Sequence, residues 1–192
     1  MLKRAVICYV FAMASLTAQT DLHQPDRQAL LKILSQVESA INAQDIEGMI
    51  ALMTPDCTVT WWNAEISHGP EEIRAYYRKM VKDEGRLITK YTTTAHLDGH
   101  ARFLGDVALA QGSMEDEFFP IIRGPFKLNS RWTASAAKGQ DGSWKIASLH
   151  LSSNVFTNQL ISELTKTIWM TGAGALVVGG LAGFFLGRRR RA

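Results

Sequence analysis

Apolar residues follow a helical period in the first part of the chain and a period of two in the later part. Helical spacing joins apolar positions from Leu30 to Ile41 and again from Ile46 to Met53. Asp26 is the predicted N-cap of the first helix. A third helix begins within 68–72, where a proline and two glutamates suit a first helical turn. One strand, 57–63, is predicted between the second and third helices.

From Leu87 onward, β-branched and aromatic residues lie between turn signals, which indicates strands. The predicted strands cover 87–96, 101–114 with a break near 105–106, 126–136 and 144–152. Helices followed by a meander of long strands are typical of an α+β fold with the helices on one face of a curved sheet. The inward face of the third helix comprises Ile73, Tyr76, Tyr77 and Met80.

The two ends of the chain carry targeting patterns. Residues 1–18 have two basic residues, an apolar run and small residues, the layout of a secretory signal peptide. After a linker (19–25) and a domain (26–156), residues 157–167 form a stalk and 168–187 a transmembrane helix. The arginines of the tail, 188–192, place the C-terminus in the cytoplasm and the domain on the periplasmic or extracytoplasmic side of the membrane.

The apolar C-terminal segment has a second interpretation, a buried helix of a globular domain. Four arginines at its end argue against that interpretation. A small-residue face, formed by Ala175, Gly179, Gly183 and Gly187, would let two such helices approach each other in lipid. We expect a homodimer, formed mainly by the domain, because the open face of a curved sheet is usually an apolar surface that needs cover.

Charge and cysteine content narrow the function classes. The formal net charge is +3, but six basic residues belong to the two ends, and 15 Lys and Arg remain against 18 Asp and Glu. A nucleic-acid partner is therefore excluded. Cys8 lies in the signal peptide, so Cys57 has no partner for a disulfide; it is either a nucleophile or, as we favour, a buried small apolar residue.

Three patches carry a resemblance to a known family. They are the run 42–59, the helix start 68–77, and 141–152 with its Asp-Gly-Ser-Trp-Lys-Ile opening. Together they resemble SnoaL-like domains, which share a cone-shaped α+β fold with nuclear transport factor 2 and ketosteroid isomerase. The resemblance covers roughly residues 26 to 156. It implies three N-terminal helices packed on a curved antiparallel sheet around a pocket.

The catalytic residues of ketosteroid isomerase are absent from the corresponding positions. That enzyme uses an Asp base and an oxyanion hole of Tyr and protonated Asp. The resemblance places the base on Trp61 and the tyrosine on Val37. No Asp or Glu occurs between Phe118 and Gln140, where the acidic partner would lie. The isomerase route of proton abstraction is therefore excluded.

Six residues are candidates for ligand binding: Trp61, Trp62, Tyr76, Arg131, His150 and Ser152. His150 and Ser152 share one side of a strand, which in similar proteins faces the pocket mouth; His150 is a general base, a ligand contact or a structural histidine. Arg131 binds an anionic ligand or pairs with Glu115, Asp116 or Glu117.

Trp61 and Trp62 alternate along one strand, so one of them should enter the cone, as an aromatic wall or as core. The segment 96–100 holds two histidines and an aspartate without a recognised ligand spacing, so we predict no metal site, and no cofactor motif is present. The chain is thus predicted to be a membrane-anchored SnoaL-like domain. It would bind a small apolar or anionic ligand, or serve as an assembly module, without catalysis. The alternative is an isomerase, cyclase or dehydratase with His150 as its base.

Overall fold

The computed structural model describes residues 23–154, 156 and 158–189, and for 159–160 and 182–189 only the backbone. The predicted signal peptide lies outside the described residues. The helical elements are α1 (Gln24–Asn42), α2 (Ile46–Ile50), α3 (Gly69–Tyr77), the π-helical turn η1 (Arg78–Lys82) and α4 (Gln159–Arg189). The strands are β1 (Met53–Thr60), β2 (Ile66–His68), β3 (Ile88–Leu97), β4 (Arg102–Leu104), β5 (Val107–Pro120), β6 (Phe126–Lys138) and β7 (Trp144–Ser153).

The strands form one curved sheet in the order β2-β1-β7-β6-β5-β3, with β4 paired to β5. The α+β class and the long meander are as predicted, and the break at 105–106 separates β4 from β5. The sheet is mixed rather than antiparallel, because β1 pairs with β7 in parallel, Thr60 opposite His150. The pattern alone did not predict this pair, since a parallel neighbour leaves no turn signal between its two strands.

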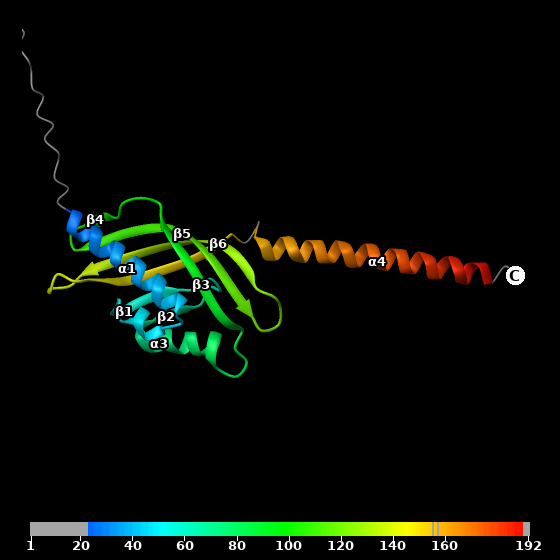
Figure 1. The fold of residues 1–192 in the computed structure, drawn as a ribbon, viewed down its shortest axis with the longest axis horizontal. Coiled ribbons are helices and arrows are strands. Elements are labelled where there is room, and N and C mark those ends of the chain that lie inside the picture. Colours follow the sequence, from blue (N-terminus) through cyan, green and yellow to red (C-terminus); the bar gives the residue numbers. More distant parts are fainter. Residues whose placement is uncertain (1–22, 155, 157, 190–192) are drawn as a thin grey trace, which may run out of the picture.

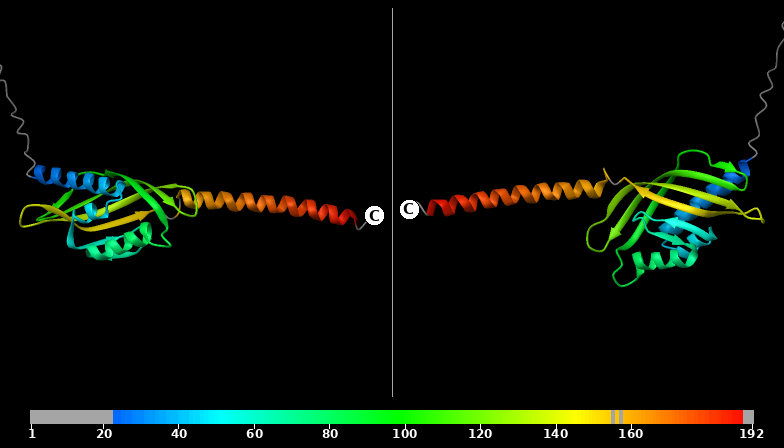
Figure 2. Two further views of the ribbon diagram at one scale, coloured as in Figure 1. Left: turned by 60° about the horizontal axis from the view of Figure 1, so that its bottom comes forward. Right: turned by 180° about the vertical axis from the view of Figure 1, so that it is seen from behind.

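The helices α1 and α3 cover the same face of the curved sheet (Figures 1 and 2). Between them and the sheet lies the core, in which Cys57, Val59 and Ile73 have no exposed surface. The interpretation of Cys57 as a buried residue is confirmed, and burial raises the pKa of its thiol.

Two helix starts show how local sequence fixes the fold. Asp45 caps α2, since its Oδ1 accepts a hydrogen bond of 2.9 Å from the backbone N–H of Gly48. The prediction that Asp26 caps α1 is wrong, because the helix begins earlier, with Pro25 in its first turn. Asp26 instead accepts hydrogen bonds from Lys138 and from the Trp144 indole, which tie α1 to the ends of β6 and β7.

The open face of the sheet is polar, which corrects the expectation of an apolar surface there. Its exposed side chains include Gln111, Glu115, Asn129, Arg131, Thr133, Ser148, His150 and Ser152. The long strands β5, β6 and β7 alternate in burial between the two faces. Their apolar members therefore point toward the helices and their polar members toward solvent.

From Gln159 onward, the predicted stalk and transmembrane segment form one continuous helix, α4, which extends away from the domain (Figure 1). Among the residues whose side chains are described, no helix contains a stretch long and apolar enough to cross a membrane. The end of the predicted span 168–187 lies outside the residues whose side chains the structure describes.

Candidate functional site

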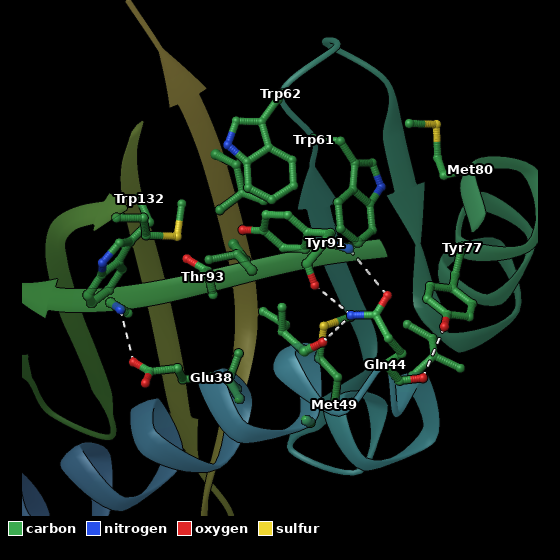
Figure 3. A pocket seen from close by; sticks show the side chains of 18 of the residues that line it. Glu38, Gln44, Met49, Trp61, Trp62, Tyr77, Met80, Tyr91, Thr93 and Trp132 are labelled. Atoms are coloured by element: carbon green, nitrogen blue, oxygen red, sulfur yellow. Dashed lines mark hydrogen bonds between the residues drawn. The ribbon is translucent and has the colours of Figure 1, made fainter. Parts of the chain in front are cut away.

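A cavity of about 140 Å³ lies between the concave face of the sheet and the helices. Aromatic and aliphatic side chains surround it from α1, α2, α3, η1, the turn after β1 and the strands β3, β5, β6 and β7 (Figure 3). Its principal apolar lining residues are Met49, Trp61, Trp62, Tyr76, Tyr77, Met80, Tyr91, Met114, Phe118, Trp132, Leu149 and Leu151. A concave apolar site of this kind suits a small apolar molecule.

Trp61 and Trp62 both line the cavity, although the alternation along a strand predicted that only one would. The strand β1 ends at Thr60, so the two tryptophans belong to the turn that follows and need not alternate. Trp61 stacks on Tyr76 with ring centroids 4.2 Å apart, and its indole N–H donates to Ser67 at 2.9 Å. Trp62 meets Tyr91 edge to face at 5.0 Å. These contacts fix both rings as rigid walls.

The inward face predicted for the third helix is present, but it spans two elements. Ile73 lies in the core, while Tyr76 and Tyr77 line the cavity from the end of α3 and Met80 from η1. A π-helical turn contains one residue more than an α-helical turn, so it shifts the side chains beyond it around the axis. Burial raises the pKa of the Tyr76 hydroxyl, which keeps this side chain neutral.

Several polar groups at the cavity wall are bound to the protein backbone. Glu38 Oε2 accepts a hydrogen bond of 2.9 Å from the Ala95 N–H on the edge strand β3. The Gln44 side chain bonds the Tyr91 backbone through both its amide nitrogen and its oxygen, and the Tyr77 hydroxyl donates to the Gln44 carbonyl (Figure 3). These groups hold α1, α3 and β3 together, and they are already partnered before any ligand arrives.

A buried carboxyl group lies directly behind the aromatic wall. Asp116 on β5 is 1% exposed, and its Oδ1 accepts hydrogen bonds of 2.7 Å from the hydroxyls of both Tyr91 and Thr93. Burial raises the pKa of Asp116, against the opposing effect of the Ser130, Tyr91 and Thr93 hydroxyls. Neither Asp116 Oδ2 nor Ser130 Oγ completes a hydrogen bond of normal geometry. Burial and the Asp116 charge also raise the pKa of Tyr91.

Three of the six predicted site residues lie together at the cavity: Trp61, Trp62 and Tyr76. The other three, Arg131, His150 and Ser152, are exposed on the opposite face of the sheet. The expectation that His150 and Ser152 face the pocket mouth is therefore wrong, because Leu149 and Leu151 are the inward residues of β7.

Arg131 makes an ion pair with Asp98, a partner that was not predicted from the sequence. Its guanidinium binds both carboxylate oxygens of Asp98, at the end of the β3 hairpin, rather than Glu115, Asp116 or Glu117. The pair holds the pKa of Asp98 below its usual range and raises that of Arg131. Asp98 is thus engaged with Arg131, and within the described residues no three potential metal-ligating side chains gather at one point.

Tyr91 and Asp116 were not predicted as part of the site. Tyr91 belonged to a predicted strand without an assigned face, and Asp116 was named only as one of three ion-pair partners for Arg131. The strand 107–120 gave one usable signal: Met114, Asp116 and Phe118 share a face, and Met114 and Phe118 are apolar. An acid at the middle position of such a face is a candidate buried carboxyl.

Comparisons with known proteins support this architecture. Residues 34–124 match the family described as the SnoaL-like domain. No curated protein is significantly similar to the chain in sequence. Just under half of the chain is therefore similar to the SnoaL-like domain family, and the fold is that of nuclear transport factor 2-like proteins.

Several solved structures share the fold at low sequence identity. A putative scytalone dehydratase from Novosphingobium aromaticivorans has a TM-score of 0.58 and 14% identity, covering 68% of this chain and 85% of its own. A ketosteroid isomerase-like protein from Erwinia carotovora atroseptica has a TM-score of 0.59 and 16% identity; the match covers 68% of this chain and 97% of that protein. A nuclear transport factor 2-like protein from Salmonella enterica has a TM-score of 0.57 and 18% identity; the match covers 69% of this chain and 94% of that protein. At these identities the likeness shows the fold alone.

Proposed function

We propose that this SnoaL-like domain binds a small, largely apolar molecule in its cone without transforming it. The observation that carries the proposal is the composition of the cavity wall, in which Trp, Tyr, Phe, Met and Leu side chains surround the space. The wall's polar groups at Glu38 and Gln44 are already bonded to the backbone, so they hold the fold rather than offer a free acid or base. An apolar ligand would be held by burial and ring contacts.

The test compares two adjacent residues of β6 that point to opposite faces. Ala134 lines the cavity and Thr133 is exposed on the open face. The probe is N-phenyl-1-naphthylamine, a neutral aromatic molecule whose fluorescence rises in apolar sites. We expect Ala134→Leu to fill the space and weaken binding by about tenfold or more, the effect of losing ~1.4 kcal/mol of contact. Thr133→Leu is the matched control and should bind like the wild type.

Equal binding by both variants would contradict the proposal, as would an absence of saturable binding to the wild-type protein. Thermal unfolding of each variant, measured on the same preparation, separates a blocked cavity from a damaged fold. Quenching of the three cavity tryptophans, Trp61, Trp62 and Trp132, gives a second measure of occupancy at the same site.

The alternative function is that of an isomerase, cyclase or dehydratase. The hypothesis that His150 is the base of such an enzyme has less support, because this side chain lies on the opposite face of the sheet from the cavity. The Tyr91–Asp116 pair favours a different version, since a hydroxyl at the cavity wall is hydrogen-bonded to a buried acid behind it, and both groups have raised pKa values. A substrate turned over by the wild type and not by Tyr91→Phe would favour catalysis.

The proposal includes membrane attachment through α4, with the domain on the extracytoplasmic side. Its support is the uncharged run from Ile168 to Leu186 and the arginines after it. Ile168, Trp169, Leu176 and Val178 are each more than half exposed, so the domain does not cover this helix. Reporter fusions at Ser153 and after Ala192 test the orientation, because only the first should be active outside the cytoplasm.

We also propose that the protein is a homodimer. Since the open sheet face is polar, the contact would consist of hydrogen bonds and ion pairs around Arg131 and His150 rather than of apolar burial. Sedimentation in detergent at micromolar concentration distinguishes a dimer from a monomer. Thr133→Arg, at the centre of that face, should shift the protein toward the monomer.

A further inference from the structure

The hairpin between β5 and β6 ends in an apolar tip, Ile121 and Ile122, which are 49% and 94% exposed. Leu87, at the start of β3, is 57% exposed and lies beside it, because the Ile121 N–H donates to the Leu87 carbonyl at 3.2 Å. We call Leu87, Ile121 and Ile122 the apolar rim. Such residues at the tip of a loop are expensive to leave in water and indicate a surface that another apolar phase covers.

The apolar rim is continuous with the wall of the cavity. The Leu87 N–H donates to the carbonyl of Met80 at 3.1 Å, and Met80 lines the cavity from η1. Ile88, the next residue after Leu87, also lines the cavity. Leu87 therefore connects the exposed hairpin tip to the cavity through an unbroken series of apolar residues.

The rim lies beside the start of α4. Arg123, the residue after Ile122, pairs with Glu163 of α4 at 3.1 Å. Figures 1 and 2 show the β5–β6 hairpin next to the root of α4, and the β6–β7 hairpin at the far end of the domain. From Glu163 to Ile168 the helix rises about 7.5 Å at 1.5 Å per residue. That rise equals about the thickness of one headgroup layer.

We infer that the apolar rim docks on the bilayer surface beside α4, so that the cavity wall at Met80 and Ile88 faces the lipid. This inference rests on the proposed attachment of α4 to a membrane. We take lipid to be the partner of the rim for one reason. When the apolar part of α4 lies in the membrane, the rim lies at the level of the lipid headgroups. The ligand class that follows is a molecule dissolved in the membrane, which would reach the cavity without crossing water.

The loop that precedes Leu87 carries no excess of positive charge that would favour anionic lipid over neutral lipid. The exposed cations Lys82 and Arg86 are accompanied by the exposed acids Asp83 and Glu84. Contact therefore depends on the isoleucines and the leucine, and neutral phosphatidylcholine is sufficient. Burial of two isoleucines at an interface is the kind of contact that anchors peripheral loops.

The experiment places an environment-sensitive nitrobenzoxadiazole label at one of three positions in the full chain, reconstituted in phosphatidylcholine bilayers. Gly124→Cys labels the rim hairpin and keeps both isoleucines; a Cβ there meets no atom within 4 Å. Gln140→Cys labels the exposed β6–β7 tip as the matched control, and Val177→Cys labels α4. All three carry Cys8→Ser, and buried Cys57 does not react.

Lipids that carry a nitroxide quencher near the headgroup end of their chains should quench the label at 124 about twofold and leave the label at 140 unchanged. Adding Ile122→Asp should abolish quenching at 124, whereas Gln140→Asp should not. If 177 is quenched and 124 is not, the rim inference is wrong and the attachment of α4 stands. The label at 177 would lie near the bilayer centre, so it is tested with lipids that carry the quencher near the ends of their chains; if these do not quench it, the attachment itself is wrong. A blue shift at 124 without quenching indicates contact with protein, such as a second copy, and overturns the inference.

Discussion

The two faces of the long strands differ in chemistry although they share the same backbone. On β6 and β7 the inward residues Trp132, Ala134, Leu149 and Leu151 line the cavity, while the outward ones are polar and exposed. The inner face is fixed by close packing, and the outer face by hydration and a few ion pairs. A substitution of the same size should therefore have very different effects one residue apart.

The largest expected effect is at Gly112, where the inner face allows no side chain. A Cβ at this position would lie 1.8 Å from the His96 carbonyl oxygen and 2.7 Å from Trp132 Nε1. We expect Gly112→Ala to lower the free energy of unfolding by about 3 kcal/mol, because a backbone atom cannot move aside as a side chain can. Chemical denaturation measures the change. Gln111→Ala, outward on the same strand, should stay within ~0.5 kcal/mol; equal losses would contradict the comparison.

A smaller change in stability, which depends on pH, is expected when Asp116 is replaced. Because burial raises its pKa above the ordinary 3.8, the folded protein binds this proton more tightly than the unfolded chain does. The contribution of Asp116 to the free energy of unfolding is therefore present at low pH, and it falls as the pH rises through the raised pKa. Asp116→Asn cannot ionise, so its stability relative to wild type should rise with pH from about 4 and then level off.

Thermal unfolding of both proteins at a series of pH values measures that difference. Glu115→Gln, on the exposed side of the same strand, is the matched control and should run parallel to the wild type. A difference between Asp116→Asn and wild type that stays constant with pH would show that Asp116 is not the ionising group. A difference that falls with pH would contradict the sign.

The smallest expected effect is at His150. The side chain is exposed on the outer face, so His150→Ala should change the free energy of unfolding by less than about 0.5 kcal/mol. Binding of N-phenyl-1-naphthylamine should also stay unchanged, because Leu149 and Leu151 line the cavity in its place. A loss above ~1 kcal/mol, or weaker binding, would place His150 in contact with the core or with the ligand.

The sequence predicted the elements well because their signals are local. Helical spacing located α2, and β-branched runs located β3, β6 and β7. Which face of a strand turns inward is set by its neighbours, and the pairing of β1 with β7 is not visible in either segment. For this reason the strand residues His150 and Ser152 were assigned to the wrong face.

Tertiary packing also explains the remaining differences at the site. Trp61 and Trp62 both reach the cavity because β1 ends one residue before them. Tyr91 and Asp116 come from two strands that are neighbours only in the folded sheet, 25 residues apart in the chain. No spacing rule joins two such residues, whereas the Tyr76 prediction used helical spacing within one element and placed this residue correctly at the cavity.

The parallel pair of β1 with β7 has a consequence for folding during synthesis. β7 is the last strand to be made, and it lies between β1 and β6 in the sheet. Until it is in place, strand pairing does not join the two halves of the described sheet, which are β1 with β2 and the β3–β5–β6 meander. Pairs such as Thr60 with His150 close a long loop, which slows folding. A chain that stops before Trp144 should therefore leave both halves exposed to chaperones and proteases.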